Sequence, residues 1–264
     1  RNALFHALKG RRQDNIAVLL KAGIDPLQSD LAHQTPLETA IAQNGDAAMA
    51  LLQATDSKRW KPQWLPVAMK QKAGAMVDRL LKGGMAIDAV DAEGRTALAY
   101  AALQGDLKRV SALLMAGADL RHADNSGVTP LHLACQQGYG DVVDALLSSY
   151  HGPLTAVLAQ GDARGSTPLH LAAAAGQGEV ITRLNNRNAD INARDGAGNT
   201  PLMVAVMNNR PRIVSQLLQL GALQEKRNNN KKNALEISQQ LGNDEISGLL
   251  QQAGKRSGVM SIFQ

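Results

Sequence analysis

One short phrase recurs along this 264-residue chain at a nearly constant spacing. Its fullest copies are Thr129-Pro130-Leu131-His132 and Thr167-Pro168-Leu169-His170. From residue 63 onward the steps between copies are 33, 33, 38, 33 and 33 residues, and such a period is typical of stacked structural repeats. One repeat cannot bury its own apolar stripe, so a chain of this kind must fold by stacking neighbouring repeats. The sequence predicts eight repeats, which start near Asn2, Thr35, Gln63, Thr96, Thr129, Thr167, Thr200 and Asn233.

A second phrase, Asp-x-x-Gly-x-Thr, precedes four of these starts, at Asp91, Asp124, Asp162 and Asp195. An Asp side chain can accept hydrogen bonds from the backbone ahead of it, and Gly adopts positive φ without strain. The phrase therefore predicts a tight turn before each repeat.

Each repeat also carries the signals of two helices. Thr is a favourable N-cap, and Pro in the first helical turn costs no hydrogen bond. Gly138 and Gly176 are placed to end the first helix in a left-handed conformation. Apolar residues at helical spacing then predict a second helix, as at Val142, Val143 and Leu146.

The start phrase, the turn phrase and the helix signals, in this fixed order, resemble the ankyrin-repeat family over essentially the whole chain. We expect a bacterial member. The resemblance implies an all-α ankyrin-repeat solenoid of about eight helix-turn-helix units with projecting β-turn fingers. We expect residues 1–254 to form a single domain and residues 255–264 to form a C-terminal tail.

Composition agrees with thin aliphatic layers, since 44% of the residues are apolar and only 3% are aromatic. No apolar run approaches the roughly 18 residues of a membrane span. The chain begins at Arg1 without Met, which we interpret as trimming. We therefore expect a soluble protein, either cytoplasmic or, if a leader was removed, periplasmic. The single cysteine, Cys135, occupies a position where the repeat has Ala and is predicted to be a buried structural thiol.

Charge is banded along the chain. Residues 1–87 and 163–264 each hold twelve Lys/Arg and seven Asp/Glu, whereas residues 88–162 hold four and nine. The acidic centre suggests a partner protein with a basic surface, bound in part through Glu93 and Asp124. The alternative is that the charges only solvate helix faces and that the acids belong to the turns. We do not expect nucleic acid, because aromatic residues for base stacking are scarce.

The 33-residue step fails in two places. Near the first, Trp60 and Trp64 lie among basic residues, and they form either an exposed binding patch or the filling of a gap left by a missing turn. The second is an extension after Ser148, where Leu154, Val157 and Leu158 predict that a helix is extended or restarted. This longer connection either contacts a partner or is tolerated loop variation.

The sequence contains no constellation typical of a catalytic, cofactor or metal site. It lacks a Gly-Lys-Ser/Thr phosphate loop, a Gly-x-Ser-x-Gly elbow and a metal-ligand spacing of His, Cys or carboxylates. We therefore predict a protein that is not an enzyme and that binds no cofactor or metal.

The resemblance implies that a partner protein binds along the fingers and first helices, and we expect the free protein to be a monomer. The predicted partner-binding residues are Ala92, Glu93, Arg95, Gln104, Asn125, Ser126, Val128, Gln136, Gln137, Tyr139, Arg164, Ser166, Ala197, Asn199, Trp60 and Trp64. A general scaffold, a dedicated inhibitor or immunity protein that neutralises a bacterial toxin or enzyme, and a binder of anionic surfaces all remain open.

Overall fold

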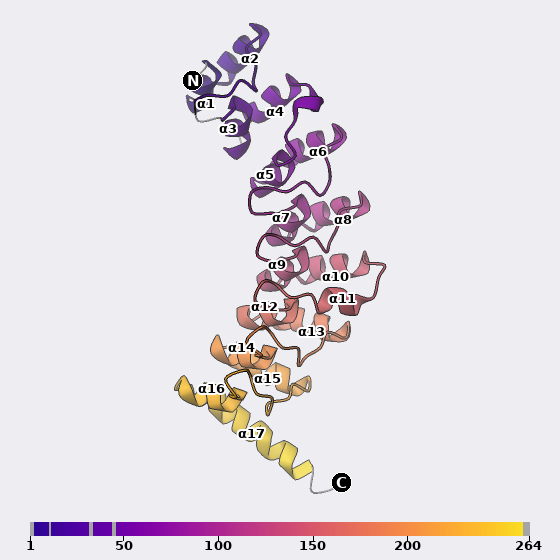
Figure 1. Cartoon of the computed structure of the whole chain (residues 1–264), viewed down its shortest axis with the longest axis vertical. Coiled ribbons are helices and arrows are strands. Elements are labelled where there is room, and N and C mark those ends of the chain that lie inside the picture. Colours follow the sequence, from indigo (N-terminus) through magenta and orange to yellow (C-terminus); the bar gives the residue numbers. More distant parts are fainter. Residues whose placement is uncertain (1–2, 11, 32–33, 44–45, 261–264) are drawn as a thin grey trace. The chain divides into compact units, whose positions relative to one another are not determined.

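The computed structural model describes residues 3–10, 12–31, 34–43 and 46–260 (backbone only for residues 13, 42, 46 and 256–260). Within them, every regular element is helical (Figure 1). The chain divides into two compact units. Unit 1 comprises Arg1–Ala101 and Met115–Asp119, and unit 2 comprises Ala102–Leu114 and Leu120–Gln264.

In unit 1 the helices alternate between two rows. Helices α1, α3 and α5 contact one another in series, and α2, α4 and α6 do the same. The helices are α1 (Ala3–Lys9), α2 (Gln13–Lys21), α3 (Pro36–Ala42), α4 (Asp46–Gln53), the 3₁₀ turn η1 (Ser57–Arg59), α5 (Trp64–Lys70), α6 (Gly74–Lys82) and the first residues of α7 (Ala97–Gln104).

Unit 2 repeats the same plan (Figure 1). The first helices of its repeats, α9, α12, α14 and α16, contact in series, and so do the second helices α10, α13, α15 and α17. The helices are α8 (Leu107–Met115), α9 (Pro130–Gln137), α10 (Gly140–Ser148), α11 (Leu154–Leu158), α12 (Pro168–Ala175), α13 (Gly178–Asn186), α14 (Pro201–Met207), α15 (Pro211–Gln219), α16 (Ala234–Gln240) and α17 (Asp244–Met260).

Each first helix begins one residue after a repeated phrase starts, and the capping chemistry explains why. The Thr35 hydroxyl accepts a hydrogen bond from the Glu38 backbone N–H at 3.1 Å, and the Glu38 carboxylate accepts one from the Thr35 N–H. Asn233 and Glu236 repeat this capping box at the start of α16. The first helices α9 and α12 end at glycines with φ of 84° and 85°, as the phrase predicts.

The core is a series of thin aliphatic layers. Leu131, Leu169 and Leu202 of the first helices are at most 1% exposed, and Val143 and Ile181 of the second helices are fully buried. Each such side chain stabilises the fold by about 1.5–3 kcal/mol. Cys135 is fully buried in the same layer, and burial raises the pKa of its thiol, which confirms the predicted structural role.

The extension after Ser148 forms the extra helix α11, so the predicted restart is confirmed. Val157 and Leu158 are its buried residues. The Gln160 amide that follows donates to the Arg121 carbonyl at 3.2 Å, which ties the extension to the preceding repeat of unit 2.

Helix α17 continues through Gly254 to Met260, so the boundary predicted at residue 254 falls within a helix. The last four residues of the predicted tail, 261–264, lie outside the described residues. The single-domain organisation stays a prediction beside the two compact units. None of the described helices combines the length and apolar composition needed to span a bilayer.

Candidate functional site

Five turns that precede first helices share one geometry, and we call them the finger turns: residues 91–95, 124–128, 162–166, 195–199 and 228–232. In the second of them, Asp124 Oδ1 accepts hydrogen bonds from the backbone N–H groups of Ser126 at 2.9 Å and Val128 at 3.0 Å. The first residue of every other finger turn accepts the same two bonds. This side chain therefore fixes the shape of the turn.

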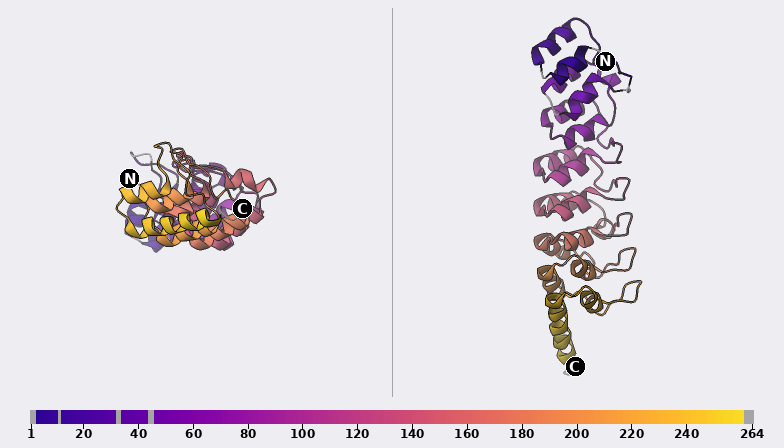
Figure 2. Two further views of the ribbon diagram at one scale, coloured as in Figure 1. Left: turned by 90° about the horizontal axis from the view of Figure 1, so that it is seen from below. Right: turned by 90° about the vertical axis from the view of Figure 1, so that its left-hand side faces the viewer.

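In unit 2 the finger turns are also joined to one another. Ala163 N–H donates to the Ser126 carbonyl at 2.8 Å, and Gly196 N–H donates to the Arg164 carbonyl at 2.8 Å. Asn229 N–H donates to the Ala197 carbonyl at 3.0 Å. The turns of this unit project beyond the helices, as the right-hand view of Figure 2 shows. We call these three bonds between turns the finger ladder, and they hold the turns in one row.

Two buried histidines, one in α9 and one in α12, each connect their helix to the following finger turn. His132 Nδ1 accepts from the Thr129 N–H at 3.2 Å, so the proton lies on Nε2, which donates to the Ser166 carbonyl at 3.0 Å. His170 makes the equivalent bonds to Thr167 and to the Asn199 carbonyl. Burial lowers the pKa of both imidazoles and keeps them neutral.

The ladder predicts that finger glycines tolerate no side chain. Gly165 has φ of 74°, and a Cβ there would lie 2.7 Å from the Gly196 nitrogen. Gly165→Ala should therefore lower the free energy of unfolding by about 3 kcal/mol or more, from backbone strain and overpacking together. Gly221→Ala is the matched control, because Gly221 has φ of 91° and no atom within 4 Å of the added Cβ. It should cost only about 1 kcal/mol. Urea denaturation measures both, and equal costs would refute the close approach.

The neutral histidines predict a pH dependence of stability. Their folded pKa lies below the ordinary value of 6.5, so the unfolded state binds more protons as the pH falls through 6.5. Stability should be complete above this value and decline below it. A double variant, His132→Gln with His170→Gln, should be less stable at pH 7.5 yet lose less stability between pH 7 and pH 5. Urea unfolding at several pH values measures the two slopes, and identical slopes would contradict the assignment.

The predicted partner-binding residues fall into three groups by exposure. The exposed group comprises Ala92, Glu93, Asn125, Ser126, Gln136, Gln137, Tyr139, Arg164 and Ala197. The half-buried group comprises Arg95, Gln104, Val128 and Ser166. The buried group comprises Asn199, Trp60 and Trp64. The structure thus leaves the finger tips and first-helix ends of unit 2 accessible.

Asn199 belongs to the internal bonding of the finger turns. Its side chain donates to Asp195 Oδ2 at 3.2 Å, and its Oδ1 accepts from the Asn228 amide at 2.9 Å. Since it is only 8% exposed, its prediction as a partner contact is corrected to a link between adjacent finger turns.

Tyr139 belongs to a series of contacts between neighbouring repeats that the sequence did not predict. A Cβ added at Gly105 would lie 2.8 Å from the Tyr139 ring, so this ring lies over the end of the preceding first helix. Gln177 and Arg210, at the equivalent positions of the next repeats, donate to the carbonyls of Gln136 at 3.2 Å and Ala174 at 3.0 Å. Tyr139 therefore packs between repeats and is only partly available to a partner. Residues 139, 177 and 210 are separated by the repeat steps of 38 and 33 residues, and this spacing was the sequence signal that they occupy equivalent positions.

At Trp60 and Trp64 the structure supports the second alternative, filling of the gap, and corrects their prediction as partner contacts. Trp60 is 9% exposed and Trp64 is 1% exposed, and the Trp60 indole N–H donates to Thr55 Oγ1 at 2.9 Å. Two of the neighbouring bases are paired within unit 1, Arg59 with Asp25 at 2.8 Å and Lys61 with Glu38 at 2.5 Å. The short step thus fills the space of a missing finger turn with two indoles.

Tryptophan fluorescence tests this correction directly, because the chain contains only these two tryptophans. We expect emission that is blue-shifted from that of free tryptophan and weak quenching by acrylamide until the protein unfolds. Strong quenching of the native protein, equal to that of the unfolded chain, would restore the exposed patch.

The acidic centre is largely occupied by internal bonds. Asp91, Asp124 and Asp162 each cap a finger turn. The Tyr100 hydroxyl, missed by the sequence analysis, lies 2.7 Å from carboxylate oxygens of both Asp91 and Glu93. Hydrogen bonds from Tyr100 and then Lys70 lower the pKa of Glu93. These bonds leave the negative charges in place, so binding of a basic partner through Glu93 and Asp124 stays a prediction, although a reversal at Asp124 would also disrupt its turn.

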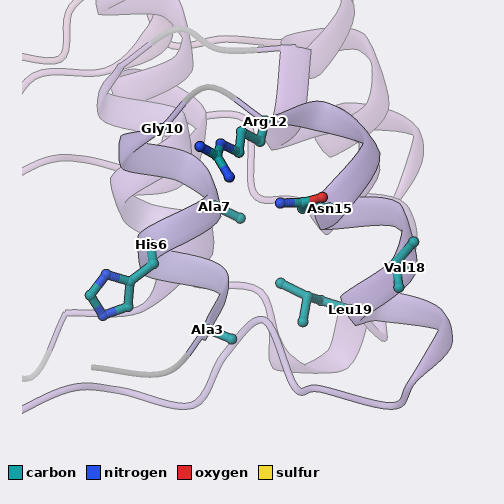
Figure 3. Close-up of a pocket in the computed structure, with 8 residues that line it drawn as sticks. All are labelled: Ala3, His6, Ala7, Gly10, Arg12, Asn15, Val18 and Leu19. Atoms are coloured by element: carbon teal, nitrogen blue, oxygen red, sulfur yellow. The ribbon is translucent and has the colours of Figure 1, made fainter.

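Hollows in the described surface do not assemble a reactive site. The one drawn in Figure 3 lies between α1 and α2, has a volume of about 410 Å³ and is lined in part by Ala3, Ala7, Val18 and Leu19. It holds His6 and Arg12 but no carboxylate. Within the described ranges, no group of three or more His, Cys, Asp or Glu is arranged to hold a metal ion.

Stacked helix pairs joined by hydrogen-bonded finger turns define a class of helical repeat protein. A family model described as ankyrin repeats (3 copies) matches residues 65–157, 117–195 and 169–258, well over half of the sequence. The chain belongs to the ankyrin-repeat family.

Individual relatives are similar over shorter stretches. The chain is 41% identical to mouse protein phosphatase 1 regulatory subunit 27 over 64 residues, which is 24% of this chain and 42% of that protein. It is 46% identical to palmitoyltransferase AKR1 of Candida glabrata over 66 residues, 25% of this chain and 9% of the relative. The chain thus spans less than half the length of these relatives. They come from a mammal and a yeast, and a bacterial origin stays a prediction.

Proposed function

We propose that this protein is a non-catalytic interaction module that binds a partner protein through the finger turns and first-helix ends of unit 2. The observation that carries the proposal is the finger ladder, which holds exposed tip residues in a fixed row. Ser126, Arg164 and Ala197 each use their carbonyl oxygen in the ladder, and their side chains are exposed.

The ladder matters for binding because it fixes the surface before a partner arrives. Ordering loops on association costs binding free energy, and a turn already held by two side-chain bonds and one inter-turn bond avoids that cost. An array of this kind presents successive tips at regular intervals along one edge, which suits an extended protein surface. Ankyrin repeats are generally interaction modules, and one relative is a phosphatase regulatory subunit by name, in accord with the proposal.

The test is affinity capture with the full chain from the organism of origin, followed by mass spectrometry. Ala197→Trp and Ser126→Trp add bulk at finger tips without adding charge, and each should reduce recovery of the wild-type partner at least tenfold. Gln219→Trp is the matched control, because Gln219 is an exposed residue at the end of α15, outside the finger turns, and it should leave recovery unchanged.

Recovery that is equal for the finger variants and wild type would overturn the proposed surface. The same experiment separates two of the three roles considered from the sequence, the scaffold and the dedicated inhibitor. Several partners captured through the finger turns indicate a scaffold, whereas one stoichiometric enzyme or toxin indicates a dedicated inhibitor.

A further inference from the structure

The last finger turn, residues 228–232, departs from the others in two ways. Asn228 takes the place of the turn Asp, and Lys231 takes the place of the Gly. Lys231 has φ of 59°, in the left-handed region that an L side chain disfavours, whereas the glycines at this position have φ of 74–75°. Strained residues of this kind persist where surrounding structure imposes them, and they cluster at functional sites.

Both substitutions change charge in the same direction. Asn228 accepts the two turn bonds from Asn230 at 3.0 Å and Lys232 at 3.1 Å without carrying a negative charge. Lys231 and Lys232 add positive charge to the same turn. The repeat thus keeps its turn geometry while exchanging an acidic finger for a basic one.

Neighbouring bases donate hydrogen bonds to neutral acceptors, and Lys232 also interacts electrostatically with the Glu236 carboxylate. Arg194 donates to the Arg227 carbonyl at 2.8 Å and to Asn229 Oδ1 at 3.4 Å, both neutral acceptors. Lys232 donates to the neutral Gln240 side chain. The exposed side chains of Arg164 and Lys231 have no hydrogen-bond acceptor among the residues that the structure describes.

The acids of this region offset only part of that charge, because residues 162–166, 194–199 and 225–236 together hold six Lys/Arg and four Asp/Glu. Asp162 and Asp195 each hold two backbone N–H groups of their own turn. Glu236 is paired with Arg227 at 2.8 Å. Glu225 remains as an exposed carboxylate on the approach to the last finger turn. We name the resulting surface the basic finger edge, defined by Arg164, Arg194, Lys231 and Lys232.

We infer that the basic finger edge binds an acidic segment of the partner protein. This inference rests on the proposed function and names the chemistry of its partner. Guanidinium groups match carboxylates in a bidentate geometry, and unpaired bases at a rim accelerate encounter with an acidic surface. A protein is favoured over nucleic acid because residues 151–262 contain no Phe, Trp or Tyr on which bases can stack.

The experiment measures fluorescence anisotropy of a labelled decaglutamate peptide with the full chain at low salt, with a labelled oligothymidylate and a decalysine peptide as competing classes. Decaglutamate should bind, decalysine should not, and binding should weaken as salt increases. Lys231→Gly and Arg164→Gln should each weaken decaglutamate binding about twofold to fivefold, the range expected of exposed charge pairs.

Matched controls separate the site from net charge. Lys72→Gly removes the same charge at a residue with nearly the same backbone, φ of 58°, at the end of α5 and outside the finger turns. Arg212→Gln removes an exposed charge from α15. Both controls should bind decaglutamate as wild type does. Lys231→Gly also relieves strained backbone, so weaker binding by this variant would not come from unfolding.

Three results would overturn the inference: no binding of decaglutamate, equal losses in Lys72→Gly and Lys231→Gly, or tighter binding of oligothymidylate than of decaglutamate. None of these decides the proposed function, which the tryptophan variants at Ser126 and Ala197 test with the captured partner. A captured partner lost by Ala197→Trp but unaffected by Lys231→Gly and Arg164→Gln would keep the proposed function and reject the acidic segment.

Discussion

The structure of unit 2 depends on one hydrogen-bonding arrangement, in which a single side-chain oxygen accepts two backbone N–H groups of its own finger turn. Asp124 shows it at 2.9 and 3.0 Å, and each later turn repeats it. Because the turn is held from within, its carbonyl is free to accept a bond from the next turn. A buried histidine then fixes the turn to the first helix of the preceding repeat. Apolar burial stacks the helices, and these bonds align the turns on the stack.

This arrangement separates structural residues from accessible ones. The backbone of the finger turns and the side chains of Asp124, Asn199 and the two histidines are used internally. Side chains at the tips, such as those of Ser126 and Arg164, are exposed, and the bonds between turns use only the backbone of these residues. This separation is the physical reason why we propose recognition by this row.

Much of the fold could be predicted because the controlling interactions are local. Capping by Thr35, the helix ends at Gly138 and Gly176, and the restarted helix at Leu154 each depend on residues within a few positions of one another. The period then places the equivalent elements along the chain.

The rest depended on contacts between repeats, which composition does not specify. Trp60 and Trp64 among bases resemble an exposed patch, yet Asp25 and Glu38 pair with those bases from the preceding repeats of unit 1. Tyr139 was predicted as a partner contact, but its ring lies over Gly105. In each case the deciding neighbour lies about one repeat away, where sequence spacing gives the distance along the chain but not the partner.

The central claim, that partners bind along the finger turns of unit 2, is tested most directly by amide NMR of the labelled full chain with and without the captured partner. The account predicts that chemical-shift changes and line broadening concentrate at residues 124–128, 162–166, 195–199 and 228–232. Changes confined to the second helices α13 and α15, with the finger turns unaffected, would contradict it.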